Sequence, residues 1–462
     1  MIPTAVGAAT VYANMGSTGE GMRLDTTFAP DTIALKKVDV VVVGGGIVGA
    51  SAALYLAQKG ISVALCEKGR IAGEQSSRNW GWIRKVKRDP RELPLMFESA
   101  RLWDMMSESV GTDIGYRTTG HLFAAETDES IAKYEDWIEQ ARDHQVGARI
   151  ITGRTLEQQM VGAGQRWKGA LYSPNEAQAE PQNAAPAIAS AAEALGAKIL
   201  TGCAVRGVEL TGGRVSAALT ESGRIDCDTL IVCSGAWTSR FLRDLGLRLP
   251  QLKVRSSVLR TAALNGPENI ALWCKEASFR KRADGGYTIG IGFTAVAPIV
   301  PDSFRFFREF LPALLMEHSS IKLRVEKSFL NEWATSKAVR ADEVSLYERT
   351  RTLDPEPDRK VTERSLFELG KLFPVFSHAQ IVEQWAGMID VTPDMLPVIS
   401  AVDSIPGLAV ATGFSGHGFG IGPGAGKLIA DIVSGAQPAV DAKPFRFSRF
   451  VDGSDIRPTT GL

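Results

Sequence analysis

Three glycines near the start of the chain are spaced as in sites that bind nucleotide phosphates. Gly44, Gly46 and Gly49 come directly after the apolar run 38–43, which is typical of a strand buried on both faces. Glycine permits a tight turn at Gly44, the approach of a pyrophosphate at Gly46, and close packing of helix on strand at Gly49. The spacing predicts a site where backbone N–H groups and a helix dipole bind a dinucleotide.

The segments that follow complete a strand–turn–helix–strand unit. Residues 50–59 are expected to form a helix that ends at Gly60, and residues 61–66 a second strand that ends at Glu67. A carboxylate about 20 residues after the glycines accepts hydrogen bonds from both ribose hydroxyls and repels a 2′-phosphate, which disfavours NADP. The unit alone does not separate FAD from NAD.

Three later segments favour FAD. Residues 76–82 are small and polar, as expected of a turn around a pyrophosphate and the flavin edge. Residues 228–237 predict a strand and a glycine turn that return the chain to the cofactor. Residues 413–426 are rich in glycine and open a helix, whose N–H groups would stabilise the negative charge that builds on a flavin as it is reduced.

The predicted cofactor contacts are spread over the glycine turn and these three segments. Beyond the three glycines and Glu67, they are Ile47, Val48, Lys68, Ser76, Arg78, Asn79, Trp80, Gly81, Ser234, Gly235, Trp237, Gly413, Gly416, His417, Gly418, Phe419 and Gly420. The five cysteines show no Cys-x-x-Cys spacing, so we expect no disulfide framework and no metal site. Cys66 and Cys233 lie in apolar runs and are expected to be buried.

The bulk composition limits the classes of function. The chain has 462 residues, enough for two or three domains, and its 52 Lys and Arg balance its 52 Asp and Glu. That balance argues against a nucleic-acid partner and against a flavin-dependent RNA-modifying enzyme. The basic segment 84–91 is interpreted as a solvated turn. Residues 1–37 carry no signal-peptide pattern, and no apolar run is long enough for a membrane span, so we expect a cytoplasmic protein.

The fold class predicted from these patterns is α/β, with a Rossmann-like FAD-binding domain and an interleaved α+β substrate domain built on a mixed sheet. The FAD-binding domain is expected to use residues 38–90, 165–250 and 380–440, and the substrate domain residues 91–164 and 251–379. Residues 1–37 would form an N-terminal arm and residues 441–462 a C-terminal tail. The arm either stays disordered or packs on a neighbouring subunit, which would make the protein a homo-oligomer.

The chain resembles the D-amino-acid-oxidase-like (DAO) superfamily of FAD-dependent amine and amino-acid oxidoreductases, from Val38 to about Ser434. Within the superfamily, the sequence most resembles members of the D-amino-acid-dehydrogenase and monomeric-sarcosine-oxidase type. The segments that carry the resemblance are the glycine unit with Glu67, 76–81, 169–172, 180–181, 231–237, 385–387, 392–394 and 413–420. By this resemblance, the backbone of Val205 holds the adenine, and residues 414–420 line the isoalloxazine.

Two positions depart from the pattern of the sarcosine-oxidase-like members. Those enzymes bind their flavin covalently through a cysteine, where this chain has Gly387, so we expect noncovalent FAD. They also use a lysine at about Gly420 to bind the substrate carboxylate, which puts a glycine-derivative substrate in doubt. The matching arginine is present as Arg84, which either binds a carboxylate through two hydrogen bonds or is a surface charge.

The substrate side of the flavin is less well defined by sequence. His417, between glycines, either donates a hydrogen bond to the flavin ring or is satisfied by backbone. Trp80, Trp82 and Trp385 either wall the pocket or fill the core. Arg260, Arg280 and Tyr287 are further candidates among which the sequence does not discriminate. Arg84, His417 and Tyr287 are the predicted catalytic set.

The resemblance implies oxidation of an amine or amino-acid C–N bond. The α-carbon would give a hydride to flavin N5, and the imine would then hydrolyse in water. We expect a D-amino acid as substrate; the alternatives are a secondary amine, such as an N-alkyl amino acid or a proline-like imino acid, and a flavin subunit of a larger dehydrogenase complex without a substrate site. The electron acceptor would be oxygen or a quinone or other electron carrier.

Overall fold

The computed structural model describes Phe28 and residues 35–291, 295–316, 321–326, 328–334 and 343–459. The predicted N-terminal arm therefore lies almost entirely outside the described residues, and its packing on a second subunit stays a prediction. No helix of the described ranges is long and apolar enough to cross a membrane.

One of the two large sheets is built around the predicted glycine unit. Its six strands run in the order β21-β22-β13-β1-β2-β9, all parallel except β21, which is antiparallel to β22. These strands are β1 (Val40–Val43), β2 (Val63–Glu67), β9 (Lys198–Thr201), β13 (Thr229–Val232), β21 (Val398–Ala401) and β22 (Leu408–Thr412). The four valines of β1 are buried on both faces, as their apolar run predicts for a central parallel strand.

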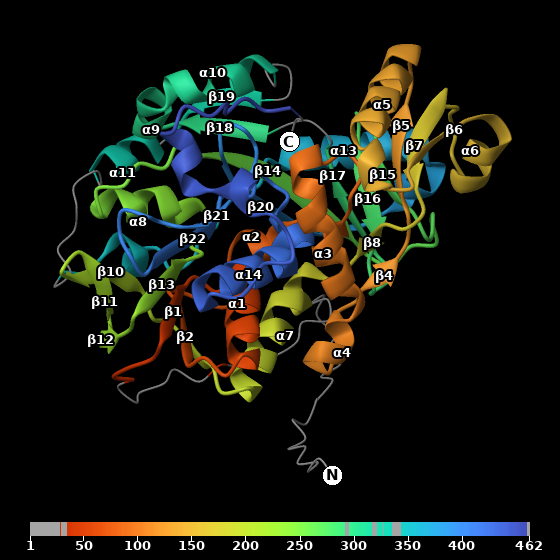
Figure 1. Ribbon diagram of the computed structural model, residues 1–462. Helices are drawn as coiled ribbons and strands as arrows, with labels where there is room; N and C mark the ends of the chain where they lie inside the picture. Colours follow the sequence, from red (N-terminus) through yellow and green to blue (C-terminus); the bar gives the residue numbers. More distant parts are fainter. Residues whose placement is uncertain are drawn as a thin grey trace, which may run out of the picture.

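Helices pack on this sheet through small residues. α1 (Ile47–Gln58) lies between α7 (Pro181–Ala194) and α14 (Gly418–Ser434), and α3 (Leu93–Asp104) covers α14 (Figure 1). A Cβ on Gly426 of α14 would lie 2.4 Å from the Cβ of Ser51 on α1. The predicted Rossmann-like arrangement is therefore present, and the glycine-rich start of α14 brings that helix against α1.

The second large sheet is mixed and has ten strands. Its order is β19-β18-β14-β17-β16-β15-β5-β7-β6, with β20 also paired to β14; the β15–β5 and β18–β19 pairs are parallel. The strands are β5 (His121–Ala125), β6 (Arg149–Ile151), β7 (Gly169–Ser173), β14 (Leu252–Thr261), β15 (Ala271–Trp273), β16 (Ser278–Lys281), β17 (Tyr287–Gly290), β18 (Ala295–Ile299), β19 (Ile321–Val325) and β20 (Ile381–Val391).

This sheet does not follow the predicted segment boundaries everywhere. β7 and β20 pair within it, although their residues fall in segments assigned to the FAD-binding domain. Helices α5 (Asp128–Gln140) and α13 (Arg359–Leu372) pack against it, and α9 (Pro301–Arg305), α10 (Phe307–Met316) and α11 (Ser328–Ala334) surround its β18–β19 edge (Figure 1). Two small sheets, β10-β11-β12 and β3-β8-β4, complete the fold; they use β3 (Trp82–Ile83), β4 (Arg117–Thr118), β8 (Ala177–Gln178), β10 (Val205–Thr211), β11 (Arg214–Thr220) and β12 (Gly223–Asp226).

Candidate active site

A cavity of about 670 Å³ is lined by residues of both large sheets and brings together the segments that the sequence singled out. The predicted cofactor residues that line it are Gly44, Gly46, Ile47, Val48, Glu67, Lys68, Ser76, Arg78, Asn79, Trp80, Val205, Ser234, Gly235, Trp237, Gly387, Gly416, His417, Gly418, Phe419 and Gly420. Gly49, Gly81 and Gly413 do not line the cavity and shape the backbone behind it.

The glycine turn presents bare backbone to one end of the cavity. Gly44 has φ +108°, and a Cβ there would lie 2.5 Å from the carbonyl oxygen of Cys233 on the neighbouring strand end. A Cβ on Gly49 would lie 2.0 Å from the carbonyl oxygen of Gly44. Both positions therefore require glycine, and the N-terminus of α1 is left accessible to an anion. Cys66 and Cys233 are buried thiols, as expected.

Glu67 stands at the end of β2, where the sequence placed it. Its carboxylate accepts hydrogen bonds from the N–H groups of Gly45 and Gly69, each at 2.7 Å. Burial raises the pKa of this carboxyl above its usual value. Glu67 thus links the glycine turn to the end of β2, and it lines the cavity with carboxylate oxygens whose further lone pairs can accept hydrogen bonds from a ribose.

Lys68 and Trp237 meet at a carboxylate that the sequence did not single out. The Glu74 side chain accepts hydrogen bonds from the Lys68 ammonium at 2.7 Å, the indole N–H of Trp237 at 3.0 Å, and the backbone N–H of Leu353 at 2.9 Å. The Lys68 ammonium also lies 4.3 Å from the centre of the Trp237 ring. No sequence signal marked Glu74, because its partners come from distant parts of the chain.

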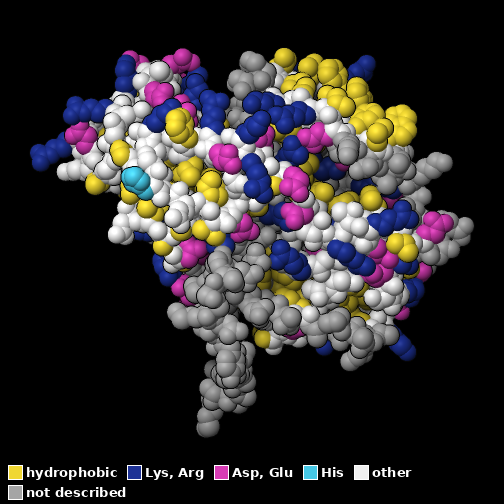
Figure 2. All heavy atoms as spheres, turned by 180° about the vertical axis from the view of Figure 1, so that it is seen from behind, with side chains coloured by type: hydrophobic (Ala, Val, Ile, Leu, Met, Phe, Trp, Pro, Cys, Tyr) yellow, Lys and Arg dark blue, Asp and Glu magenta, His cyan; other side chains and the backbone are white. Residues whose placement is uncertain are grey.

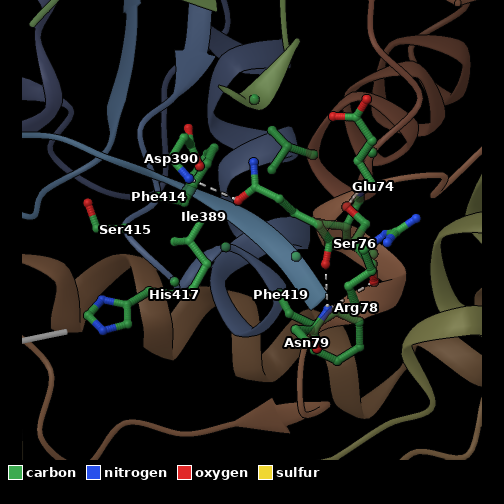
Figure 3. A pocket seen from close by; sticks show the side chains of 18 of the residues that line it. Glu74, Ser76, Arg78, Asn79, Ile389, Asp390, Phe414, Ser415, His417 and Phe419 are labelled. Carbon is green, nitrogen blue, oxygen red and sulfur yellow. Dashed lines mark hydrogen bonds between the residues drawn. The ribbon is translucent and has the colours of Figure 1, made fainter. Parts of the chain in front are cut away.

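The turn 76–81 is fixed by its own side chains. The Ser76 hydroxyl accepts a hydrogen bond from the Ile47 N–H at 2.9 Å, and the Asn79 amide bridges the Ser76 carbonyl and the Gly81 N–H. Arg78 donates to the carbonyl oxygens of Gly73 and Ala386 and to Asp354. Figure 3 shows Ser76, Arg78 and Asn79 on the opposite side of the view from His417 and Ser415.

The N-terminus of α14 closes the cavity on that second side. Asp390 is buried behind it and accepts hydrogen bonds from the Gly413 N–H at 2.7 Å and the Gln251 amide at 2.8 Å. Burial raises the pKa of Asp390. The first N–H groups of a helix have no intrahelical partners, so the cavity-lining start of α14 offers donors and the positive end of a dipole. Asp390 was not identified from the sequence.

Arg84 lies on the cavity wall without a carboxylate partner among the described residues. It donates to the Val86 carbonyl, and its guanidinium carbon lies 5.6 Å from the centre of the Phe123 ring. Burial, with the charge of Arg88 nearby, lowers the pKa of Arg84 to about 9, so the side chain stays cationic near neutral pH. The geometry fits a residue that binds an anion inside the cavity.

A second buried arginine stands beside it. Arg88 is 2% exposed, with its Nη1 3.5 Å from a Glu92 oxygen and its Nη2 donating to the His417 carbonyl at 3.3 Å. The same Glu92 oxygen, Oε2, lies 3.4 Å from Nδ1 of His417. Burial and the Arg88 charge lower the pKa of His417 to about 4, so its imidazole is neutral near neutral pH.

The expectation that 84–91 is a solvated turn is therefore wrong. Lys85 is also buried, at 8% exposed, and its ammonium lies 3.3 Å from the Glu176 carboxylate, while the Glu176 oxygens accept the N–H groups of Lys85 and Val86. A basic run is buried here because Glu92 and Glu176 supply the opposite charge.

Three other predicted substrate contacts lie away from the cavity lining. Tyr287 is fully buried in the core beneath the ten-stranded sheet and donates to the Pro267 carbonyl at 2.9 Å, which corrects its assignment to the catalytic set. Arg280 pairs with Glu180 at 2.8 and 3.0 Å, and Arg260 with Glu383 at 2.9 Å. Both guanidinium groups are thus paired with carboxylates of the protein itself and stabilise the fold.

Of the three tryptophans, Trp80 and Trp82 line the cavity, whereas Trp385 donates to the Arg78 carbonyl at 2.9 Å from outside it. The cavity lining also includes a group of apolar residues that was not identified from the sequence, together with the polar residues Lys87, Lys133 and Ser256. The apolar residues are Phe123, Val254, Val258, Trp273, Ile291, Ala295, Met316 and Ile321. Alternation along a strand shows which side chains share a face but does not show which face lines a cavity.

Comparison with known proteins identifies the family. The model of the FAD dependent oxidoreductase family, DAO, matches residues 39–432. The chain belongs to the DAO family of FAD-dependent oxidoreductases. The structure of L-amino acid deaminase from Proteus myxofaciens in complex with anthranilate superposes with a TM-score of 0.88 at 32% identity, covering 94% of this chain and 97% of that one. L-amino acid deaminase from Proteus vulgaris gives 0.87 at 32%, covering 93% and 100%. The sarcosine oxidase subunit beta of Arthrobacter sp is 25% identical over 90% of this chain and 92% of its own length.

The expected superfamily, fold class and cofactor are thereby confirmed: the chain of this DAO member carries a Rossmann-like FAD-binding domain and a substrate domain. The residues on the cavity wall fit the cofactor. The bare backbone at Gly44 and the exposed start of α1 suit a pyrophosphate, and the start of α14 suits the electron-rich edge of a flavin. Residue 387 is glycine, so it offers no thiol to a flavin. A Cβ at this position would meet only Arg78 within 4 Å, at 3.3 Å.

Proposed function

We propose that this DAO member oxidises the C–N bond of an amino acid whose carboxylate binds Arg84. The single observation that carries this proposal is a cationic guanidinium on the cavity wall with no carboxylate partner among the described residues. A partly desolvated charge is costly unless it is paired, and a planar guanidinium binds a carboxylate through two parallel hydrogen bonds. The substrate supplies the missing partner.

The charge around Arg84 supports an anionic substrate. Arg84, Arg88 and the N-terminus of α14 are positive, and Glu92 is the acidic side chain in contact with Arg88 and His417. The acidic residues on the cavity wall, Glu67, Glu74 and Asp390, already accept hydrogen bonds from protein donors. A simple amine without a carboxylate would leave an excess of positive charge in a low-dielectric site.

The apolar wall supports a substrate with a large apolar side chain. Phe123, Trp273, Val258 and Met316 face the cavity from β5, β15, β14 and α10. Glycine or sarcosine would leave this wall uncovered, whereas a side chain as large as that of leucine or phenylalanine gains about 1.5–3 kcal/mol from burial. We therefore propose an amino acid with a bulky aliphatic or aromatic side chain.

The chain's own residues hold and orient the reactants. Bound FAD supplies the chemistry of accepting a hydride from the substrate α-carbon, after which the imine hydrolyses in water. We propose that Glu67 binds the ribose, that the start of α1 binds the pyrophosphate, and that His417 and the start of α14 contact the flavin. With glycine at position 387, the cofactor is proposed to be noncovalent.

The stereochemistry of the substrate is a separate question. The sequence-based expectation is a D-amino acid, whereas the two similar solved structures at 32% identity are L-amino acid deaminases. We propose the L-enantiomer on that similarity. The D-enantiomer and proline-like imino acids are the competing substrates against which it must be tested.

Anaerobic mixing of the FAD-loaded protein with single substrates tests the proposal. We expect L-leucine, L-phenylalanine and L-methionine to bleach the oxidised flavin absorbance, and the amines that lack the carboxylate to bleach it far more slowly. Bleaching by D-amino acids alone would support the D-amino acid substrate that the sequence predicts. Preferential bleaching by imino acids would favour a secondary-amine substrate. Failure of the whole panel would indicate a flavin subunit without a substrate site.

The electron acceptor is tested after bleaching. Re-oxidation on admission of oxygen would assign an oxidase, and re-oxidation only on addition of a soluble quinone would assign a dehydrogenase.

A further inference from the structure

A segment that the sequence assigned to the substrate domain packs against residues assigned to the FAD-binding domain. Residues 345–354, all of which the structure describes, begin with the short helix α12 (Leu346–Arg349), capped by the Ser345 hydroxyl, and contain no strand. In the chain the segment lies between α11 and α13. Its polar groups nevertheless contact residues 68–78 and 206–221, on the other side of the predicted domain division.

The backbone of this segment is hydrogen-bonded to the loop that follows β2. The Lys68 ammonium donates to the Thr350 carbonyl at 2.6 Å, and Arg351 donates to the Lys68 carbonyl at 2.9 Å. The Leu353 N–H donates to Glu74 at 2.9 Å. Because Lys68 and Glu74 both line the cavity, the segment lies directly behind two residues of the cavity wall.

The contact is so close at Gly69 that no side chain fits there. A Cβ on Gly69 would lie 2.3 Å from the carbonyl oxygen of Arg351 and 3.2 Å from the hydroxyl oxygen of Thr352. The Gly69 N–H donates to Glu67, the proposed ribose acceptor, at 2.7 Å. Gly69 therefore connects segment 345–354 to the proposed ribose site.

Two ion pairs attach the segment to β10 and to the turn between β11 and β12. Arg206 donates to both Glu348 oxygens, at 2.8 and 2.9 Å, and Arg351 donates to both oxygens of Glu221. Exposed charges of both signs cover much of the face in Figure 2, and pairs between such charges contribute little to stability. The Arg206–Glu348 pair differs because its side chains are only 18% and 8% exposed.

One aromatic side chain of the segment reaches the cavity. Tyr347 lines the cavity and is buried, with its ring centre 5.9 Å from that of Trp237 and 6.2 Å from that of Phe241. Its hydroxyl is buried without a hydrogen-bond partner among the described residues. Burial raises the pKa of this hydroxyl well above its usual value, so it remains a donor. An unpartnered buried hydroxyl on a residue of the cavity wall is the kind of group that a bound molecule satisfies.

We infer that residues 345–354 form a strap over the adenosine half of the bound FAD, and that Tyr347 contacts this half directly. The segment binds Lys68 and Arg206, which are the chain neighbours of Glu67 and Val205, the residues proposed to hold the ribose and the adenine. An aromatic ring with a hydroxyl donor suits a nucleoside, which offers a face for stacking and several acceptors. The inference rests on the proposed position of the ribose at Glu67.

The strap is built so that it can open. Between Glu348 and Asp354 it is attached by the hydrogen bonds and ion pairs given above, and water can replace such contacts at small net cost. FAD that is held beneath the strap leaves only after these contacts have broken. We therefore expect the strap to set the rate at which FAD is released.

Dilution of the FAD-loaded, full-length protein, followed by the recovery of flavin fluorescence, gives the rate of FAD release. Tyr347→Leu should raise this rate about tenfold, because a base–aromatic contact is lost while an apolar side chain is kept. Glu348→Gln, which breaks the ion pair with Arg206, should raise the rate about three- to tenfold. Salt should accelerate release from the wild type more than from Glu348→Gln.

Matched controls separate the strap from a general loss of stability. Tyr134→Leu removes a similarly buried tyrosine that does not line the cavity, and Glu209→Gln breaks an ion pair with Arg224 in the small sheet that contains β10. Both should leave FAD release unchanged. Gly69→Ala is an independent test, because its methyl group displaces the strap without removing any polar group of the strap, and it should also accelerate release.

Trypsin cleavage of the wild type tests whether the strap and the cofactor are coupled. Arg349 and Arg351 are exposed residues of the strap. We expect cleavage after them to be about tenfold faster in the apoprotein than in the FAD-loaded protein, because the empty site lets the strap open. Cleavage after Arg166, whose side chain is 91% exposed away from the cavity lining, should proceed at the same rate in both.

Two outcomes would overturn the inference. One is unchanged FAD release in Tyr347→Leu, Glu348→Gln and Gly69→Ala. The other is equal cleavage of the strap with and without FAD, which is measured on the wild type and so stands even where a variant fails to fold. Failure of amino acids to bleach the flavin would contradict the proposed function alone, because neither experiment uses a substrate.

Discussion

Arg88 occupies the space that a side chain on Gly420 would need. The guanidinium Nη2 lies 3.0 Å from the position that a Cβ on Gly420 would take, and the backbone of Trp82 and Ile83 closes the same space at 3.3 and 3.5 Å. The resemblance to sarcosine-oxidase-like enzymes implies a lysine at about this position. In this chain, a buried arginine from another element brings a positive charge to the same part of the site.

Gly420→Ala should therefore weaken binding of a carboxylated substrate. The added methyl group displaces the Arg88 guanidinium, whose positive charge supports the carboxylate that we propose binds Arg84. We expect KM to rise about three- to tenfold, because only part of a charge-assisted interaction of about 1.5–3 kcal/mol is lost. Steady-state kinetics measure the change. Gly207→Ala is the matched control, because no heavy atom lies within 4 Å of a Cβ at Gly207; an equal effect of both substitutions would contradict the role of Arg88.

Arg84→Gln should separate substrates by their carboxylate. Loss of a bidentate ion pair raises KM for the amino acid by about 10- to 100-fold, whereas KM for the corresponding amine should change little. The comparison uses initial rates with both substrates. Arg142→Gln, which removes a surface guanidinium paired with Glu139, serves as the control. Equal loss on both substrates would remove Arg84 from the carboxylate site.

The part of the site that was predictable from sequence is the part built from short-range patterns. Gly44, Gly46 and Glu67 lie in one strand–turn–helix–strand unit, so their spacing in the sequence is enough to predict how they lie relative to one another. The start of α14 was found for the same reason, since its glycines cluster within a few residues.

The parts that were not predictable depend on partners far apart in the chain. Glu74 is recognised as part of the wall only when Trp237 and Leu353 are placed beside it. Lys85 can be buried because the carboxylate of Glu176, which is 91 residues later in the chain, lies next to its ammonium group. Tyr287 was wrongly placed because the residues of a strand alternate between two faces, and the sequence does not say that this face packs against Phe376.

Glu67→Ala should weaken FAD binding by about tenfold or more, because it removes the proposed ribose acceptor and also leaves the N–H groups of Gly45 and Gly69 without their partner. Titration of the apoprotein with FAD, followed by quenching of flavin fluorescence, gives the dissociation constant. Glu129→Ala, at an exposed pair with Lys133, is the control. Unchanged affinity would exclude Glu67 from the ribose site, and reduced stability of the apoprotein with unchanged affinity would leave it only a structural role.

His417 should make the protein less stable in mild acid. Burial beside Arg88 lowers its pKa to about 4 from 6.5, so between these values the unfolded chain binds a proton that the folded chain does not. The free energy of unfolding therefore falls as pH falls through this window, by about 2 kcal/mol between about pH 7 and about pH 5 for this one group. Glu67 and Asp390 have raised pKa values and act in the opposite direction, but they do so equally in wild type and variant.

The difference between wild type and His417→Gln isolates the histidine. Urea unfolding of the two proteins at both pH values should show a smaller loss of stability in the variant, because glutamine takes up no proton. His144→Gln in the short helix η2 (Arg142–His144), where the histidine is only half-buried, should retain the wild-type loss. The same loss in His417→Gln as in wild type would show that the imidazole takes up its proton at the same pH in the folded and in the unfolded chain. The Glu92 carboxylate at 3.4 Å would then hold an ion pair with it.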